Sequence, residues 1–258
     1  MQARRRREIM KKPILVILFI SLISSALHSQ DDRPVRFAFA VLPATSWIKP
    51  EGDVLSVEAN KFAFSYGVLA DIMIAGNPNY AFGTGVMVNS QGGTLGNSKY
   101  HDGDTTQTGF ASAEEAISLQ YLDIPLTLKL RTNEIGYLTY YGQFGLDMSF
   151  RLKARRDLTY NFENEPEQEV SDEDISDITL PIRMALQVGA GVEYNVSGTT
   201  YLVGGIVWNN GITNVFDRNF IKEDSDGNPE FSENNVLREG GKIKAINNYL
   251  GLTLGVVF

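Results

Sequence analysis

Cysteine is absent from all 258 residues of the chain. The chain therefore has no disulfide, no thiol nucleophile, no thiolate metal site and no cysteine for a lipoprotein anchor. Long apolar runs are also missing, and the mean hydropathy is only -0.13. A helical membrane protein needs about 20 consecutive apolar residues for each span, so that class is excluded. A transmembrane β-barrel is not excluded, because each spanning strand is apolar on one face only.

Histidine, the commonest acid–base residue of enzymes, is almost as scarce. His101 is the only histidine after residue 29, and it falls in a polar stretch near Asp102 and Asp104. A lone histidine in a loop has no rigid frame that would hold it against a nucleophile. We therefore predict a protein without enzymatic activity and without a cofactor.

One acidic motif resembles the start of a calcium-binding loop. Residues 224–230 read Asp-Ser-Asp-Gly-Asn-Pro-Glu, which places Gly227 fourth from Asp224. An EF-hand loop requires its glycine at the sixth position and a glutamate at the twelfth. Asp-Gly-Asn-Pro is common turn chemistry. We therefore expect a turn here and predict no metal site in the chain.

The first 29 residues have the three parts of a secretory signal peptide. Basic residues precede an apolar run at 14–23, and several small residues follow within 24–29. The run is too short to span a bilayer easily, so a cleaved signal is favoured over an uncleaved anchor. Cleavage is expected after Ser29, with Ala26 as the alternative. The segment holds six basic residues and one acidic residue, so its loss changes the net charge from -8 to -13 and disfavours nucleic acid as a partner.

Residues 30–258 alternate between segments of period two and polar connections. In 178–193 the even-numbered positions are apolar, while the odd-numbered positions include Arg183, Gln187 and Glu193. Successive side chains of a strand point to opposite faces. A membrane barrel turns the apolar face toward lipid and keeps the polar face inside. Seven further segments share this pattern or a weaker form of it: 35–46, 61–75, 80–89, 121–131, 137–153, 200–210 and 249–258.

The connections between these eight segments alternate in length. Short turns are expected at 76–79, 132–134 and 196–198, and long polar loops at about 47–60, 90–115, 154–176 and 211–243. Outer-membrane barrels have short periplasmic turns and long outer loops, whereas a soluble lipocalin-like barrel has no reason to sort its loops in this way. We therefore predict an all-β domain over 30–258. It is an eight-stranded antiparallel transmembrane up-and-down β-barrel of the cell outer membrane, with short periplasmic turns and long outer loops.

Two prolines and a set of aromatic residues add local expectations. Pro125 and Pro181 fall inside predicted strands and cannot donate to a sheet ladder. We expect a bulge or an unpaired carbonyl at each, with the ring in the lumen. Aromatic residues near strand ends, among them Tyr140, Tyr141 and Trp208, are expected to form the interfacial girdles of a barrel.

Seven charged residues on polar strand faces should point into the lumen. They are Asp123, Lys129, Arg131, Asp147, Arg151, Arg183 and Glu193. An eight-stranded barrel is just wide enough for side chains to fill it, and buried charges must be paired. We therefore predict a salt-bridge plug in place of an open channel. A general porin is excluded, since it needs about sixteen strands.

Several segments resemble a known family. Residues 121–129, Tyr-Leu-Asp-Ile-Pro-Leu-Thr-Leu-Lys, are similar to a segment typical of the PorT-like outer-membrane β-barrels of Bacteroidetes, and 141–145 resembles the glycine-rich strand that follows it. Residues 189–194 and 209–214 resemble a later strand and the turn into the last long loop. The family label covers many barrels without assigned roles, and its namesake assists a secretion and gliding machine. The terminal Phe258 resembles the signal by which the barrel-assembly machinery recognises its clients.

These patterns together predict a non-enzymatic structural or interaction barrel of the cell envelope. Service to a secretion or gliding machine is the more specific version of this hypothesis. The alternative is a narrow pore or a small-ligand carrier that uses the polar lumen. The expected partners are outer-membrane lipid and lipopolysaccharide, the barrel-assembly machinery during insertion, and envelope or secretion-complex proteins.

Overall fold

The computed structural model describes residues 34–51, 55–97, 110–162, 166–217, 219–221 and 239–258. The chain divides into a unit of residues 1–34 and a second unit, Val35–Phe258, which holds all the described strands. The expected signal peptide at 1–29, His101 and the expected turn at 224–230 lie outside the described residues. Among the described residues, no helix has the length and apolar character needed to cross a membrane.

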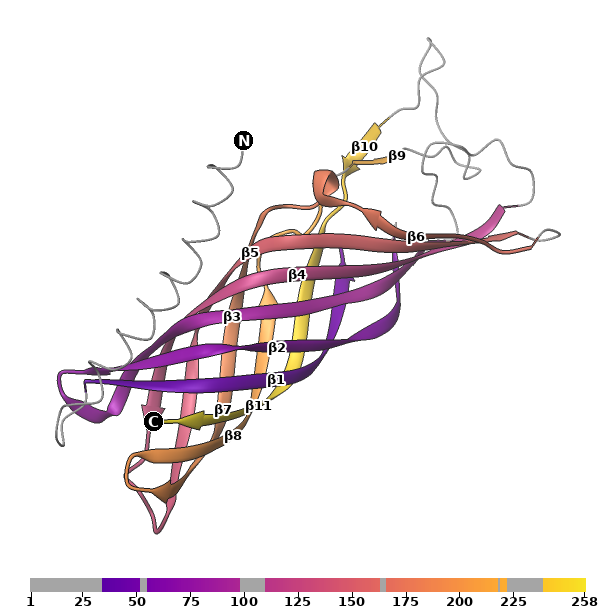
Figure 1. Ribbon diagram of the computed structural model, residues 1–258. Helices are drawn as coiled ribbons and strands as arrows, with labels where there is room; N and C mark the ends of the chain where they lie inside the picture. Colours follow the sequence, from indigo (N-terminus) through magenta and orange to yellow (C-terminus); the bar gives the residue numbers. More distant parts are fainter. Residues whose placement is uncertain (1–33, 52–54, 98–109, 163–165, 218, 222–238) are drawn as a thin grey trace, which may run out of the picture. The chain divides into compact units, whose positions relative to one another are not determined.

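Eight long antiparallel strands form a closed ring (Figure 1). Their order around the ring is β4-β3-β2-β1-β11-β8-β7-β5, and pairing between β5 and β4 closes it. The strands are β1 (Val35–Pro50), β2 (Ser56–Ile74), β3 (Asn77–Asn97), β4 (Phe110–Arg131), β5 (Leu138–Phe162), β7 (Ile182–Ser197), β8 (Thr200–Gly211) and β11 (Ala245–Val257). The predicted all-β, eight-stranded antiparallel fold is confirmed.

Three shorter strands and one turn of 3-10 helix lie between the ring strands. β6 (Gln168–Asp174) pairs with the far part of β5, and η2 (Ser176–Ile178) follows it. β9 (Asn219–Ile221) and β10 (Glu239–Lys242) form a separate two-stranded sheet. All of these elements belong to the connections that the sequence predicts to be long.

The two ends of the ring differ in their connections. At one end, here called the turn end, β2 joins β3, β4 joins β5 and β7 joins β8 through a few residues each. These turns contain Gly76, Gly136 and Gly198 at φ angles of 70°, 68° and 55°, a left-handed conformation that glycine adopts without a steric penalty. At the opposite end, here called the loop end, β3 joins β4, β5 joins β7 and β8 joins β11 through longer connections, whereas β1 joins β2 through residues 51–55 only. The predicted alternation is therefore present for three of the four loops, but the expected loop at 47–60 is mostly strand, because β1 runs to Pro50 and β2 starts at Ser56.

The strands alternate as a membrane barrel requires, with the apolar face outward. On β11, Leu250, Leu252, Leu254 and Val256 are exposed on the outer face. On β8, Leu202, Ile206 and Trp208 are exposed, while Val207 and Asn209 are buried inside. This resolves the orientation of β8, whose two faces are hard to tell apart in sequence because both are mostly apolar or glycine. The exposed leucines and valines leave an apolar outer wall that lipid, not water, would suit.

Several strands are longer than the sequence predicts. β5 pairs with β7 only up to Phe150, but it continues to Phe162 in a sheet with β4 and β6. Figure 1 shows β3, β4 and β5 running on together beyond the ring, with β6 beside them. The expected loops at 90–115 and 154–176 are therefore strand over much of their length. One face of this extension is buried, but it mixes charged and apolar side chains such as Glu115, Arg156 and Leu158, so its period-two signal is weak.

The two prolines have different outcomes. β3 and β4 pair Gly83 with Thr127 and Met87 with Asp123 in one unbroken register, so Pro125 between them causes a gap in the ladder and not a bulge. The Pro125 ring is buried and lines the lumen, as predicted. Pro181 instead lies just before β7 with an exposed side chain, because the strand starts four residues later than expected.

Candidate functional site

The barrel interior is the candidate functional site, and its character changes in layers along the barrel. The buried inward positions of β4, read from the turn end, are Arg131, Lys129, Thr127, Pro125, Asp123, Tyr121, Leu119 and Ile117. They pass from charged through polar to apolar. Together with side chains from the other strands, these residues form an ion cluster, a polar cluster and an apolar layer in the lumen.

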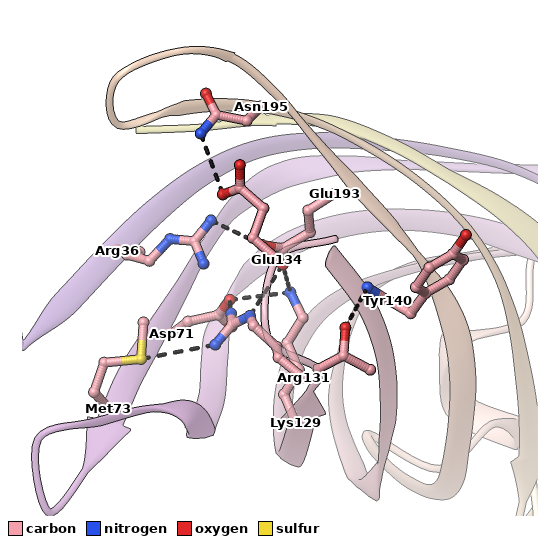
Figure 2. A network of polar contacts seen from close by, with 10 residues as sticks. Arg36, Asp71, Met73, Lys129, Arg131, Glu134, Tyr140, Glu193 and Asn195 are labelled. Carbon is pink, nitrogen blue, oxygen red and sulfur yellow. Dashed lines mark hydrogen bonds and ion pairs between the residues drawn. The ribbon is translucent and has the colours of Figure 1, made fainter. Parts of the chain in front are cut away.

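The first layer is an ion network at the turn end, seen in Figure 2. We call Arg36, Asp71, Lys129, Arg131 and Glu193 the turn-end ion cluster. Glu193 Oε1 lies 2.9 Å from Lys129 Nζ and 3.1 Å from Arg131 Nε, and Glu193 Oε2 lies 2.8 Å from Arg36 Nη2. Asp71 Oδ2 lies 3.0 Å from Lys129 Nζ and also contacts Arg131 Nη2. Four strands supply the five side chains, so the network ties opposite walls of the barrel together.

Two aromatic rings complete this layer. Lys129 Nζ lies 4.4 Å from the centre of the Tyr141 ring, and the Arg36 guanidinium lies 4.6 Å from the centre of the Tyr201 ring. Both distances are within the range of cation–π attraction. Tyr141 is 7 % exposed and points inward, so its predicted place in an outer girdle is wrong. Tyr140 and Trp208 do lie on the outer face, and both are exposed.

The second layer consists of amides and charges held by hydrogen bonds. We call Asn89, Asp123, Asp147, Arg183 and Asn209 the mid-barrel cluster. Asn89 Nδ2 donates to Asp123 Oδ2 at 2.6 Å, and Asn209 Nδ2 donates to Asp147 Oδ2 at 3.0 Å. Arg183 Nη2 donates to Asn209 Oδ1 at 2.5 Å. All five residues are buried, yet the two carboxylates meet amides and no ion pair joins them to Arg183 within the described part of the chain.

The third layer is an apolar lid at the loop end. Three connecting segments, 175–180, 213–217 and 243–245, lie over the inward side chains of β1, β3 and β4, and we call them the loop-end lid. Their buried side chains form one cluster with those of the barrel wall: Ile48, Leu55, Leu95, Ile117, Leu119, Tyr121, Ala154, Ile175, Val215, Phe216, Ile243 and Ala245. Packing of this kind excludes water from the mouth of the barrel.

Backbone and side-chain hydrogen bonds hold the three lid segments to one another. Leu180 N donates to Val215 O, and Val215 N donates to Ala245 O, both at 2.8 Å. Asn214 uses its amide nitrogen to donate to Phe216 O at 2.6 Å and to Ile243 O at 2.8 Å. The lid is therefore an ordered layer in which hydrogen bonds join its segments to one another.

Arg151 fastens the lid to the barrel wall. Its Nη1 atom donates to Ser176 O at 2.7 Å, to Thr179 Oγ1 at 2.6 Å and to the carbonyl of Thr179. Its backbone nitrogen donates to Pro181 O at 2.8 Å. The structure therefore places Arg151 under the lid and not in an ion pair of the lumen.

A cavity of about 70 Å³ lies between the two polar layers. The mid-barrel cluster contributes Asp123 and Asp147 to its wall, and the turn-end ion cluster contributes Asp71 and Lys129. Pockets that bind drug-sized ligands measure about 300–1,000 Å³. The cavity can therefore hold a few water-sized groups but no organic ligand of ordinary size.

The structure brings the seven predicted lumen residues into the interior but distributes them among different layers. Lys129, Arg131 and Glu193 lie in the turn-end ion cluster, Asp123, Asp147 and Arg183 in the mid-barrel cluster, and Arg151 at the lid. Arg36 and Asp71 were not among the charged residues predicted from the sequence to lie in the lumen, although Asp71 lies on the polar face of the segment 61–75. Within the described residues, no group of three or more His, Cys, Asp or Glu side chains is placed to hold a metal ion.

A closed ring of eight antiparallel strands with an apolar outer wall and a charged, filled interior defines a small membrane β-barrel. The family comparison agrees: the model of the outer membrane protein beta-barrel domain matches residues 35–217, and the chain belongs to that family. It is therefore a protein of the cell outer membrane. No curated protein matches the chain in sequence.

Solved structures with a similar fold are other small outer-membrane barrels. The chain is similar to a major outer membrane protein from Thermus thermophilus, with 15 % identity, a TM-score of 0.41, and coverage of 87 % of this chain and 98 % of that one. It is similar to Neisserial surface protein A, with 13 % identity, a TM-score of 0.40, and coverage of 86 % and 95 %. It is also similar to Ail of Yersinia pestis, with 12 % identity, a TM-score of 0.36, and coverage of 87 % and 99 %. These likenesses concern the fold alone.

Proposed function

We propose that the protein is a non-enzymatic, non-conducting barrel that serves as a structural or interaction protein of the cell envelope. The observation that carries this proposal is the closure of the lumen at both ends. The turn-end ion cluster crosses the lumen at one end, and the loop-end lid covers it at the other. A solute that passed through would have to break several buried ion pairs as well as an apolar cluster, which is strongly unfavourable.

Because the lumen is closed, a partner would have to bind the surface of the barrel that lies beyond the membrane. The extended sheet at the loop end offers such a surface, with exposed acidic residues on β6 and on neighbouring strands such as Glu58, Glu114 and Glu169. We propose that this end lies outside the cell and the turn end in the periplasm, as in other outer-membrane barrels. Outer-membrane lipid and lipopolysaccharide then surround the wall, and the barrel-assembly machinery inserts it.

The more specific version is an accessory role in a secretion or gliding machine. It is supported only by the resemblance of 121–129 and 141–145 to PorT-like barrels of Bacteroidetes. Deleting the gene in its own host and measuring the delivery of proteins to the cell surface tests this version. Unchanged delivery would contradict the accessory role and leave the closed-barrel proposal standing.

The alternative function, a narrow pore or small-ligand carrier, is supported by the polar lining of the lumen. The cavity of about 70 Å³ argues against it, since a carrier needs several times that volume. Single-channel recording of the full chain in planar bilayers separates the two functions. We expect no steps of conductance from the wild-type protein, and regular steps would overturn the proposal.

The orientation can be tested with single cysteines, because the chain has no cysteine of its own. Glu169→Cys places a thiol on β6 at the loop end, and Glu134→Cys places one in the turn between β4 and β5, with both positions exposed. A membrane-impermeant maleimide added to intact cells should label the first variant and not the second. Labelling of the second alone would mean that the barrel is inserted the other way round.

A further inference from the structure

Two buried carboxylates of the mid-barrel cluster have no ionic partner within the described part of the chain. Asp123 is 3 % exposed and Asp147 1 % exposed. The other buried acids are paired, since Glu193 meets three cations and Glu115 lies 3.2 Å from Arg156. A buried carboxylate needs a compensating charge or a proton, because its transfer out of water is costly.

The cations nearest to this pair are bound by other groups. Arg183 donates to Asn209 Oδ1 at 2.5 Å, to Asn247 O at 2.8 Å and to Ser149 Oγ at 3.3 Å. Arg151 donates hydrogen bonds to the lid. Lys129 forms ion pairs with Asp71 and Glu193 (Figure 2). The cations of the described residues therefore leave the charge of Asp123 and Asp147 without a direct counterion.

One oxygen of each carboxylate already accepts a hydrogen bond. Asn209 must turn its Nδ2 toward Asp147, because its Oδ1 accepts a hydrogen bond from Arg183, so Asp147 Oδ2 acts as an acceptor. Asp123 Oδ2 likewise accepts from Asn89 Nδ2. The remaining oxygen of each carboxylate, Oδ1, is buried and has no hydrogen-bond partner among the described residues. A proton on either Oδ1 would have to donate to water in the cavity or to the other carboxylate, whereas a cation there would compensate the charge of both groups.

Both aspartates line one cavity. Pro125 pairs with Asp147 and Asp123 pairs with Ser149, so the two aspartates are diagonal neighbours on adjacent strands and face the same side. Both line the cavity of about 70 Å³, which has room for about four or five water-sized groups. Neutral oxygen atoms on the same wall come from Thr127, Gln143, Gln187 and Tyr249.

We propose that this cavity is a binding site for a hard metal cation, held by the Oδ1 atoms of Asp123 and Asp147. Two carboxylate oxygens, neutral side-chain oxygens and water are the ligand types that a cation such as Ca²⁺ or Na⁺ takes in proteins. The ion would supply the counterion that the lumen lacks, and would link β4 to β5 where Pro125 interrupts the ladder between β4 and β3. The site is independent of the proposed function, since a closed barrel needs no ion to remain closed.

The test measures unfolding of the full chain in detergent after removal of metal, with CaCl2, NaCl or choline chloride added back at equal ionic strength. If one of the two metals binds, it raises the ratio of folded to unfolded protein by about a hundredfold once its free concentration reaches about a hundred times Kd. The double variant Asp123→Asn and Asp147→Asn should lose this response. It should also fold without metal, because it has no buried charge to compensate.

Two single variants serve as controls, each an acid-to-amide change elsewhere. Glu115→Gln alters a buried carboxylate that is paired with Arg156 and does not line this cavity, and Asp177→Asn alters an exposed one. Both should keep the metal response. Tb³⁺, a luminescent substitute for Ca²⁺ that is excited through nearby tyrosines such as Tyr249, gives a second readout in the wild-type protein. An equal metal response in the double variant would place the ion on the surface of the protein. No response to either metal in the wild-type protein would mean that a proton or water, and not a metal ion, compensates Asp123 and Asp147. Either result overturns the proposal.

Discussion

The hydroxyl oxygen of Tyr141 occupies the space that a Cβ atom on Gly205 would need. The same oxygen would lie only 2.6 Å from a Cβ atom on Gly191, which is paired with Gly205 across β7 and β8. Two glycines on facing strands thus make room for the inward ring of Tyr141, which in turn lies against Lys129. The glycines position the turn-end ion cluster without contacting its charges.

The neighbouring Gly204 provides a matched control for this relationship. A Cβ atom on Gly204 would meet nothing within 4 Å, because this residue faces outward. We expect Gly205→Ala to lower the free energy of unfolding by about 1–3 kcal/mol through overpacking. Gly204→Ala should leave it unchanged or raise it slightly, since alanine loses less backbone entropy on folding. Urea unfolding in lipid vesicles measures both, and equal effects would mean that Tyr141 adjusts freely.

The second prediction concerns Glu193, the anion shared by three cations. Glu193→Gln should lower the free energy of unfolding by about 3–5 kcal/mol, because it leaves buried positive charge without its partner. Glu134→Gln is the control, since Glu134 is exposed in a turn and accepts only a long hydrogen bond of 3.4 Å from Asn195. Its effect should stay within about 0.5 kcal/mol. A loss below about 1 kcal/mol for Glu193→Gln would indicate that water enters this layer.

The face of each strand could be predicted from sequence, but the partners of each charge could not. Period two assigns Asp123, Lys129 and Glu193 to the lumen, because one register fixes every side chain of a strand. Which charges meet depends on how the strands are ordered and staggered around the ring. Arg36 and Glu193, for instance, are 157 residues apart and on strands that are not neighbours. No local sequence pattern encodes a pairing between residues so far apart in the chain.

Two kinds of feature were hidden from the sequence for physical reasons. Asn89 and Asn209 orient the buried carboxylates, but neutral amides are equally common in exposed loops, so they give no signal of burial. The loop-end lid was missed because its segments are short and irregular. Ile175, Val215 and Phe216 look like isolated apolar residues in polar loops until the fold brings them together.

The third prediction tests the fastening of the lid by Arg151. Arg151→Ala removes three hydrogen bonds to the carbonyls of Ser176 and Thr179 and to the Thr179 hydroxyl. We expect the amides of Leu180 and Val215 to exchange with deuterium at least tenfold faster, because the lid opens locally. Lys153→Ala, two residues along the same strand at an exposed position, should change nothing. Unchanged exchange in Arg151→Ala would mean that apolar packing alone holds the lid.

The fourth prediction concerns pH at the junction of β6 and η2, outside the membrane. Hydrogen bonds from Ser176, whose backbone nitrogen lies 2.9 Å from Asp174 Oδ1, hold the pKa of Asp174 below its usual value. A lowered pKa in the folded state stabilises the junction at pH values above the unfolded pKa, and this contribution is lost as the pH falls through the folded pKa. The protection factor of the Ser176 amide, which compares its exchange rate with that of an unstructured amide at the same pH, should therefore fall in acid. Asp174→Asn should abolish this acid dependence, and an unaltered pH profile in that variant would assign it to another group.

The last prediction separates two roles of Phe258. Its backbone closes the seam between β11 and β1 through Phe258 N to Phe37 O at 2.9 Å, and its ring lies 5.5 Å from the ring of Phe39. Phe258→Ala and Phe39→Ala remove the same ring contact, so both should destabilise the refolded barrel in detergent to a similar degree. If the terminal aromatic residue is also the assembly signal, only Phe258→Ala should lower the amount of barrel in the outer membrane of cells, several-fold relative to Phe39→Ala. Equal amounts in cells would mean that the contribution of Phe258 is limited to the seam.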